Sequence, residues 1–135
     1  MIKFILTFYL FFTCFITSYS QNSILDSLVT KHQKRLNKGQ FMLSCSQNYY
    51  TEMDSMLNVV YKDVKRKLSI ESDRLKLKQS ELKWLKEREI YFEKIYKEIK
   101  SEFAQDEMMF YTERKAKFVL DRINFLINWN KSNMY

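Results

Sequence analysis

The chain contains no proline and a single glycine, Gly39. Strand-rich proteins use both residues to punctuate frequent turns, so their scarcity argues against sheets and favours a few long helices. With 135 residues there is room for one domain at most. Because 46% of the residues are apolar and 16% aromatic, the chain can build a core and is not disordered in character. We therefore predict an all-α fold.

Residues that carry chemistry are equally scarce. Beyond the N-terminal segment there are one cysteine, Cys45, and one histidine, His32, which cannot supply the usual four-ligand shell of a structural metal site. There is no glycine-rich phosphate loop, and no Ser/His/Asp or Cys/His arrangement. Asp54 with Glu81 or Glu89 offers a carboxylate pair, but carboxylates recur on any charged helix. The sequence predicts a non-enzyme, with no catalytic residue, no cofactor and no metal.

The N-terminus has the outline of a secretory signal peptide. Lys3 supplies a positive start, residues 4–16 form an almost unbroken apolar run, and Ser18 and Ser20 stand at positions −3 and −1 of a cut before Gln21. The run is shorter than the ~20 residues that a spanning helix needs. We expect residues 1–20 to be removed and the protein to be periplasmic or secreted, without a membrane span.

Cleavage there changes both the charge and the cysteine content. Removing residues 1–20 takes away one base and no acid, which leaves 22 bases against 16 acids and a net charge of +6. Such a chain either meets an anionic envelope partner or simply gains solubility. Cys14 leaves with the signal peptide, so Cys45 is either a buried, inert thiol or a bridge to a second chain in a dimer.

Residues 21–40 are expected to form a short helix and a lead-in. Ser23 and Asp26 match a capping box, and Gly39 reads as the stop. Between Asp26 and Gly39 the apolar residues recur at helical spacing. His32 lies on the same side of the helix and is expected to be a packed or edge residue. Residues 41–130 would form the main domain and residues 131–135 a frayed tail.

Three longer helices are predicted over about 47–68, 73–103 and 108–129. Ser72 is the expected N-cap of the second. That helix carries two adjacent apolar rows, so we expect it to be the central helix, covered from more than one side. The rows are Leu75, Leu82, Leu85, Phe92, Tyr96, Ile99 and Phe103, and Leu77, Trp84, Tyr91 and Ile95. The fold class is thus an antiparallel helical hairpin extended to a three-helix bundle, plus the short N-terminal helix.

The basic residues of the first long helix fall mostly on its outer face: Lys62, Lys65, Arg66 and Lys67. An exported chain seldom meets nucleic acid, so a solvated face is the better interpretation and no nucleic-acid partner is expected.

An antiparallel pairing of the first two long helices, with its turn near residue 71, makes partners sum to about 142. The polar and aromatic residues that interrupt the apolar rows then face one another: Asp54 faces Arg88, Asn58 faces Trp84, and Tyr61 faces Glu81. Two interpretations remain open. The cluster either fixes the register of the helices or receives a partner.

These residues, in this order and spacing, resemble the LprI-like lysozyme-inhibitor N-terminal domain family. The family pattern is a Cys, then Asp-x-x-Leu-Asn-x-x-Tyr, then Gln-x-x-Trp-x-x-x-Arg-Asp with a second Cys four residues beyond the Arg, and often a Tyr-Thr-Glu-Arg segment. The positions that match it here are Cys45, Asp54, Leu57, Asn58, Tyr61, Trp84, Arg88 and Arg114.

Three positions depart from the family pattern. Glu81 stands at the Gln position, Glu89 follows the Arg, and Phe92 takes the place of the second Cys. The interhelical disulfide that the resemblance implies cannot form, so Phe92 must hold by packing what a bridge would hold covalently, at a loss of about 2–4 kcal/mol.

The resemblance implies an exported, helical, non-catalytic domain that binds lysozyme or another envelope protein. The charge of +6 opposes an encounter with lysozymes of the common, strongly basic type, unless acids such as Glu52, Asp63, Glu71 and Asp73 cluster on one face. The alternative is a basic, envelope-facing interaction module for an anionic partner such as an envelope polymer, with no lysozyme inhibition.

Overall fold

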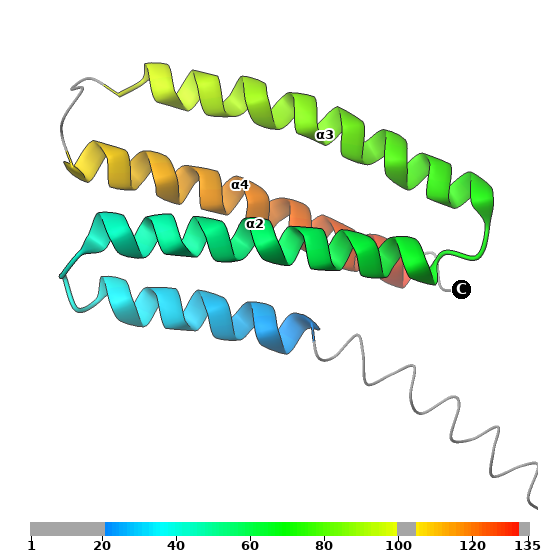
Figure 1. Ribbon diagram of the computed structural model, residues 1–135, viewed down its shortest axis with the longest axis horizontal. Coiled ribbons are helices and arrows are strands. Elements are labelled where there is room, and N and C mark those ends of the chain that lie inside the picture. Colours follow the sequence, from blue (N-terminus) through cyan, green and yellow to red (C-terminus); the bar gives the residue numbers. More distant parts are fainter. Residues whose placement is uncertain (1–20, 100–104, 133–135) are drawn as a thin grey trace, which may run out of the picture.

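The computed structural model describes residues 21–99 and 105–132, and within these every regular element is a helix (Figure 1). Residues 21–36 are helical, and they are followed by α2 (Met42–Lys67), α3 (Glu71–Lys97) and α4 (Gln105–Ser132). The predicted all-α helical bundle is confirmed. The expected signal peptide, residues 1–20, lies outside the described residues.

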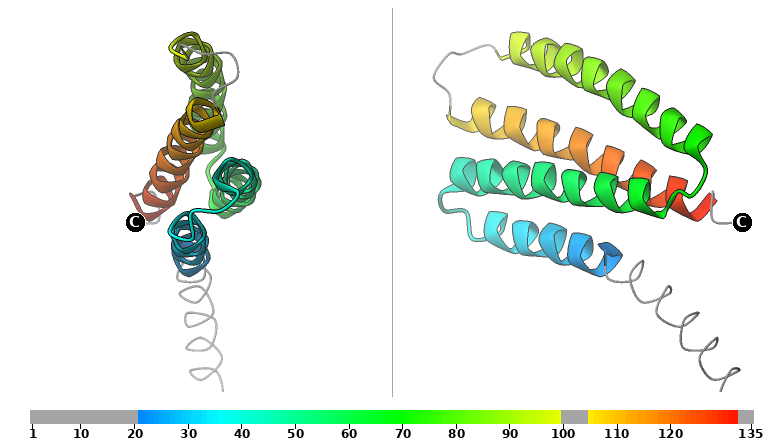
Figure 2. Two further views of the ribbon diagram at one scale, coloured as in Figure 1. Left: turned by 90° about the vertical axis from the view of Figure 1, so that its left-hand side faces the viewer. Right: turned by 45° about the vertical axis from the view of Figure 1, so that its right-hand side comes forward.

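The helices α2 and α4 form the centre of the bundle. They run in the same direction, side by side, while α3 and residues 21–36 run the opposite way on either side of them (Figures 1 and 2). Residues 21–36 pack on α2, and α3 forms the far edge of the molecule.

The core lies mainly between α2 and α4. Met53, Val60 and Val64 of α2 recur at helical spacing and are at most 1% exposed. On α4 the fully buried row is Ala116, Val119, Ile123 and Leu126. Burial of each larger side chain contributes about 1.5–3 kcal/mol, so this pair of helices supplies much of the hydrophobic stabilisation.

The expectation that the second long helix is central is wrong. On α3 the row that contains Leu77, Trp84 and Ile95 is buried, whereas Leu75 and Leu82 are 54% and 52% exposed. Of the neighbouring row, Leu85 and Phe92 still reach the core, but Leu75, Leu82 and Tyr96 are exposed because α4 packs on α2 and leaves α3 covered on one side only.

The helix boundaries differ from expectation at several ends. Residues 21 and 22 are already helical, so a capping box at Ser23 is wrong. Gly39 has φ 67° in the turn after residue 36, which confirms the predicted stop. The helix α2 begins five residues earlier than expected, with Phe41 as its N-cap in a left-handed conformation.

The junction between α2 and α3 is tighter than predicted. Ile70, in an extended conformation, is the N-cap of α3, so an N-cap at Ser72 is wrong. Arg74 donates from Nε to the carbonyl of Leu68 at 2.7 Å, which satisfies a free acceptor at the end of α2.

Candidate functional site

The predicted contact between Asp54 and Arg88 is present. Nη1 of Arg88 lies 3.6 Å from Oδ1 of Asp54, and Nη2 lies 3.1 Å from Oε1 of Glu89. The side chains of Arg88 and Asp54 are 24% and 40% exposed, so the pair lies at the rim of the α2–α3 junction. The register predicted for these two helices is confirmed here.

Two basic side chains beside this pair, Arg88 and Lys115, lie over aromatic rings. The guanidinium of Arg88 lies 5.4 Å from the ring centroid of Trp84 and 6.0 Å from that of Phe92. From α4, Nζ of Lys115 lies 4.2 Å from the centroid of Tyr50 and 4.9 Å from that of Phe92. Burial, reinforced by the charge of Arg88, lowers the pKa of Lys115. These contacts join all three long helices at one point.

A second ion pair, which the sequence did not predict, is more deeply buried. Arg122 of α4 donates from Nη2 and Nε to Oε2 of Glu81 at 2.8 and 3.2 Å, and from Nη1 to Oγ of Ser80 at 3.1 Å. The side chains of Arg122 and Glu81 are 6% and 16% exposed. Burial, followed by the charge of Glu81, raises the pKa of Tyr61. In the sequence, Arg122 lies between the apolar residues Val119 and Ile123 of one buried row, and this position indicates a buried charge that needs a partner.

The remaining pairing predicted between α2 and α3 is only partly seen. Tyr61 lies near Glu81, as expected. Asn58 is exposed and donates to the carbonyl of Asp54 at 3.0 Å, and Trp84 turns towards α4, where it stacks on Phe118 at 5.7 Å. Leu57, at the adjacent motif position, is a core residue.

Cys45 is a free, partly buried thiol whose Sγ lies 3.9 Å from the carbonyl oxygen of Gln40. Phe92 packs edge-on against Tyr50, with the ring centroids 6.1 Å apart. Cys45 and Tyr50 are about 140° apart around the axis of α2. Phe92 therefore packs on a different side of α2 from the one that carries Cys45.

Arg114, the last motif position, lies on the outer side of α4. Its Nη1 donates to Oε2 of Glu98 at 2.5 Å, and its guanidinium lies 5.9 Å from the ring centroid of Tyr91. It links the C-terminal end of α3 to α4.

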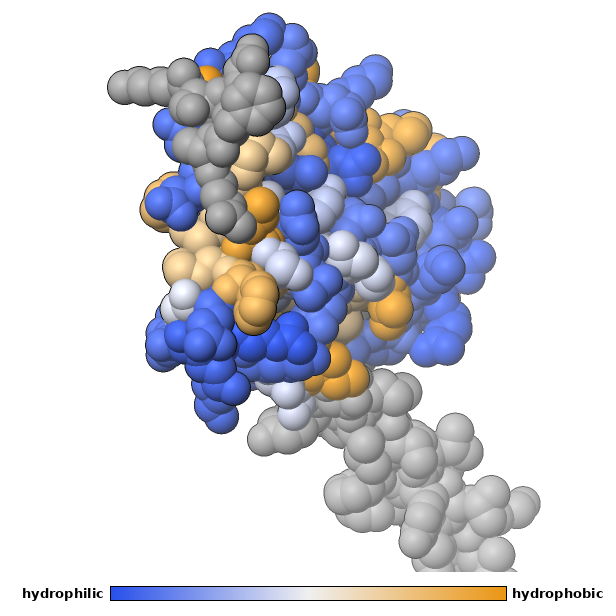
Figure 3. All heavy atoms as spheres, turned by 60° about the vertical axis from the view of Figure 1, so that its left-hand side comes forward, coloured by the Kyte–Doolittle hydropathy of each residue, from blue (hydrophilic) through white to orange (hydrophobic). Residues whose placement is uncertain are grey.

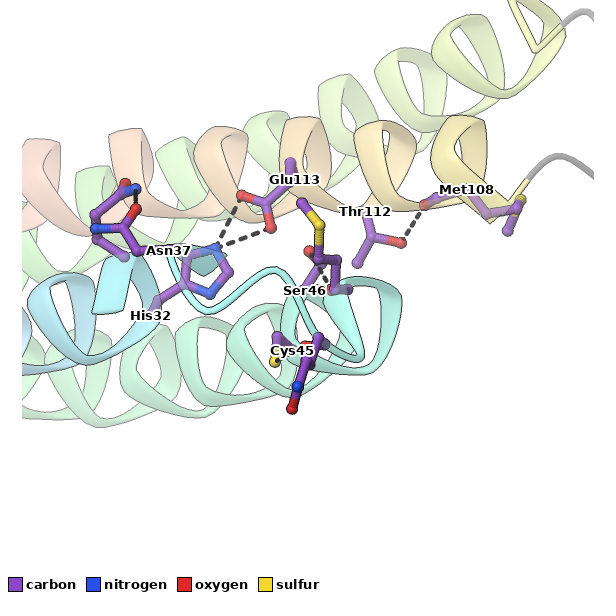
Figure 4. A network of polar contacts seen from close by, with 10 residues as sticks. His32, Asn37, Cys45, Ser46, Met108, Thr112 and Glu113 are labelled. Atoms are coloured by element: carbon purple, nitrogen blue, oxygen red, sulfur yellow. Dashed lines mark hydrogen bonds and ion pairs between the residues drawn. The ribbon is translucent and has the colours of Figure 1, made fainter. Parts of the chain in front are cut away.

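His32 attaches the N-terminal helical residues to the bundle (Figure 4). It is 5% exposed, stacks on Tyr49 at 3.9 Å, and its Nε2 lies 3.0 and 2.9 Å from the two carboxylate oxygens of Glu113. The expectation of a packed histidine is confirmed, while its partner, 81 residues away, was not predicted.

A second attachment of the N-terminal helical residues is at Asp63, which is 8% exposed. It accepts hydrogen bonds from Gln21 at 3.0 Å and Arg66 at 2.6 Å, and Nζ of Lys67 lies 2.7 Å away. Burial disfavours the carboxylate, but the hydrogen bond and charge of Lys67, then Arg66 and Gln21, outweigh it and hold the pKa of Asp63 below its usual value.

The acids named above as a possible lysozyme-facing cluster are each paired with a base, and Asp63 is buried. Glu52 pairs with Lys31, and Asp63 with Arg66 and Lys67. Glu71 and Asp73 each pair with a base three residues further along α3.

A shallow groove follows the junction of α3 and α4. We call it the α3–α4 groove, and it is lined by Trp84, Glu87, Tyr91, Glu113, Phe118, Asp121 and Phe125, with basic residues between them. Phe118 stacks on Tyr91 at 4.6 Å, so the groove has an aromatic floor. Two pairs of its charges neutralise each other, Lys117 with Asp121 and Lys83 with Glu87, and its other charged residues pair with residues outside the lining. The groove is thus close to neutral on a basic protein.

Across residues 21–99 and 105–132, no three His, Cys, Asp or Glu side chains are placed to hold a metal ion. Over the same residues, no helix is both long and apolar enough to cross a bilayer. The arrangement is that of a helical bundle braced by ion pairs and aromatic contacts.

Comparisons with curated proteins and with solved structures found no match for the chain. A comparison with protein-family models did find one. The family described as "Lysozyme inhibitor LprI" matches residues 20–126, which include every motif position placed above. The chain therefore belongs to the lysozyme inhibitor LprI family.

Proposed function

We propose that the protein is an exported, non-catalytic binding domain that binds a lysozyme and blocks its action. The observation that carries this proposal is the match of the lysozyme inhibitor LprI family to residues 20–126. Export after cleavage before Gln21 is part of the proposal, and it rests on the charge, length and small residues of the N-terminal segment.

The distribution of charge favours one face for this contact. Residues 21–41 hold four bases and one acid, and so supply three of the six excess positive charges of residues 21–135. The helix α3 lies at the opposite edge of the bundle (Figure 1). Common lysozymes are strongly basic, so like-charge repulsion is weakest at the neutral α3–α4 groove.

The side chains of the groove also suit a protein partner. Interfaces derive most of their binding energy from a few aromatic and arginine side chains that become desolvated. Tyr91 and Phe118 are partly exposed in the groove, and Phe125 is 45% exposed at its end. We therefore assign the lysozyme contact to the α3–α4 groove.

The test is a lysozyme turbidity assay with purified residues 21–135. We expect clearing of a bacterial cell-wall suspension by a common-type lysozyme to slow at micromolar protein. The absence of inhibition at that concentration would remove the lysozyme proposal.

A matched pair of charge reversals tests the face. Asp121 and Glu93 are both exposed acids with a lysine partner one helical turn away, but only Asp121 lines the groove. Because like charges across an interface cost several kcal/mol, Asp121→Lys should weaken inhibition at least about tenfold. Glu93→Lys should change it little. Equal effects of the two variants would remove the assignment to the groove.

A second candidate is a basic interaction module for an anionic envelope polymer, and the net charge of +6 favours it. Salt-sensitive binding to an acidic polysaccharide, without lysozyme inhibition, would support this candidate. No binding at low ionic strength would remove it.

A further inference from the structure

The most exposed large apolar side chain among the described residues is Phe41, at 81%. It immediately precedes α2 and has φ 53° and ψ 38°, in the left-handed region. A bulky residue rarely adopts this conformation, because its Cβ is crowded there. The connection between residue 36 and α2 thus holds an aromatic ring in solvent at a cost in backbone strain.

Other partly exposed apolar side chains lie at the same end of the bundle. Met42 and Leu43 open α2 and are partly exposed, and Met108 is partly exposed at the start of α4. Both helices begin at this end of the bundle, and the space-filling view of this end shows an apolar patch bordered by strongly hydrophilic residues (Figure 3). A contiguous exposed apolar patch of this kind marks an interaction surface.

The hydrophilic border nearest to Phe41 in the chain is basic. Lys34, Arg35 and Lys38 lie at the end of the N-terminal helical residues and in the following turn. Between Asp26 and Glu52 the sequence has four bases and no acid. Only Lys31 of these bases is paired with another described residue, namely Glu52. Residues 34–43 therefore combine three bases with exposed apolar side chains, and the acids at this end of the bundle, Asp106 and Glu107, belong to the first turn of α4.

We propose that residues 34–43, which we call the basic–apolar tip, bind the surface of an anionic lipid bilayer. Phe41 enters the boundary between headgroups and acyl chains, and Lys34, Arg35 and Lys38 contact the headgroups. Binding at this boundary requires both an apolar insertion and an attraction to anionic lipid, and the tip supplies both. An anionic polymer would use the bases alone and would leave the exposed aromatic ring and its strained backbone unused.

The tip is independent of the proposed lysozyme contact. It consists of the end of the N-terminal helical residues, the following turn and the start of α2, whereas the α3–α4 groove runs along the opposite edge of the bundle (Figures 1 and 2). Bilayer binding through the tip leaves the groove open. Lysozyme inhibition is therefore neither required for the lipid experiment nor affected by its result.

The experiment measures co-sedimentation of purified residues 21–135 with vesicles. One set contains phosphatidylglycerol and phosphatidylcholine, and the other phosphatidylcholine alone. We expect binding to the anionic set only, with weaker binding as the salt concentration rises. The absence of binding to the anionic vesicles at low ionic strength would overturn the proposal.

Variants separate the two parts of the tip. Each lysine near an anionic surface is worth about fivefold in partitioning, so Lys34→Gln with Lys38→Gln should weaken binding roughly 25-fold. Phe41→Ala should weaken it about tenfold, since part of a phenyl ring no longer leaves water. All three side chains are exposed, so the fold is expected to persist, and circular dichroism checks that it does.

Matched controls come from the other end of α2. Ile70 is an apolar residue in a connection and is 59% exposed, while Lys62 and Lys65 are exposed lysines on the same helix. Ile70→Ala, and Lys62→Gln with Lys65→Gln, should change binding by less than about twofold. Equal losses from control and tip variants would overturn the location.

A soluble acidic polysaccharide serves as the second ligand. If it binds as tightly as the vesicles, and Phe41→Ala leaves vesicle binding unchanged, the tip recognises anionic charge alone and the bilayer proposal fails. Loss of vesicle binding in Phe41→Ala with no change in polysaccharide binding supports insertion.

Discussion

Arg122 of α4 and Glu81 of α3 form a buried ion pair in which two nitrogens of the guanidinium reach the same carboxylate oxygen, at 2.8 and 3.2 Å. The guanidinium also lies 5.6 Å from the ring centroid of Trp84. The helix α3 is covered on one side only, and this ion pair lies on the covered side, where α3 contacts α4. It is more deeply buried than the pair of Arg114 with Glu98, which also ties α4 to the end of α3.

Glu81→Ala should therefore lower the free energy of unfolding by about 3–5 kcal/mol, since it leaves a buried guanidinium without its counter-charge. Urea unfolding followed by circular dichroism measures the change. The control is Glu87→Ala on the same helix, whose ion pair with Lys83 is long, at 3.8 Å, and exposed. A similar, small loss in both variants would contradict the importance of the buried pair.

The motif pair of Asp54 and Arg88 should contribute much less. At 3.6 Å and with both side chains partly exposed, it lies in the range where ion pairs are worth under about 1 kcal/mol. Asp54→Ala should thus shift the urea midpoint only slightly. A double-mutant cycle with Arg88→Ala isolates the coupling energy, and a coupling as large as that expected of a buried pair would refute this ranking.

Periodicity and punctuation were enough to predict the helical bundle and one helix register. The spacing of apolar residues identified the helices, and counting outwards from the turn near residue 71 placed Asp54 against Arg88. Both features depend on contacts within a helix or between helices adjacent in sequence. Such contacts follow from local geometry.

The features that were not predicted depend on helices distant in sequence. The apolar rows of α3 do not show that α4 packs mainly on α2 rather than covering α3. This packing leaves Leu75 and Leu82 exposed. The pairing of His32 with Glu113 spans 81 residues, and nothing local to either residue specifies it. The same holds for Arg122, whose place in an apolar row marked it as unusual without naming its partner.

Asp63 should make the docking of the N-terminal helical residues sensitive to acid. Its pKa in the folded protein is lowered, so its contribution to stability is present above the unfolded value, near about 4, and is lost as the pH falls through the folded value. At neutral pH, Asp63→Asn should lower the free energy of unfolding by about 1–3 kcal/mol. Thermal unfolding of both proteins from neutral to acidic pH measures this difference.

The difference between the parent and Asp63→Asn should shrink as the pH falls below the folded pKa, because the parent then carries a neutral side chain as well. A difference that stayed constant down to the lowest pH would show that the charge of Asp63 is not what stabilises this contact. Asp121→Asn, which removes an exposed carboxylate paired with Lys117, is the control.

Phe41 gives a prediction that separates backbone strain from side-chain contact. Its φ of 53° is tolerated far better by asparagine than by phenylalanine or alanine. Phe41→Asn should therefore raise the free energy of unfolding by about 1 kcal/mol relative to Phe41→Ala, since both variants remove the exposed ring but only asparagine relieves the strain. Thermal unfolding of the two variants measures the difference.

The combined result for stability and binding shows what the ring is for. If Phe41→Asn is more stable than Phe41→Ala and both weaken vesicle binding equally, the ring is retained for its interaction with lipid at the expense of stability. Equal stability of the two variants would mean that the left-handed backbone costs nothing here, and the strain argument for the basic–apolar tip would fall.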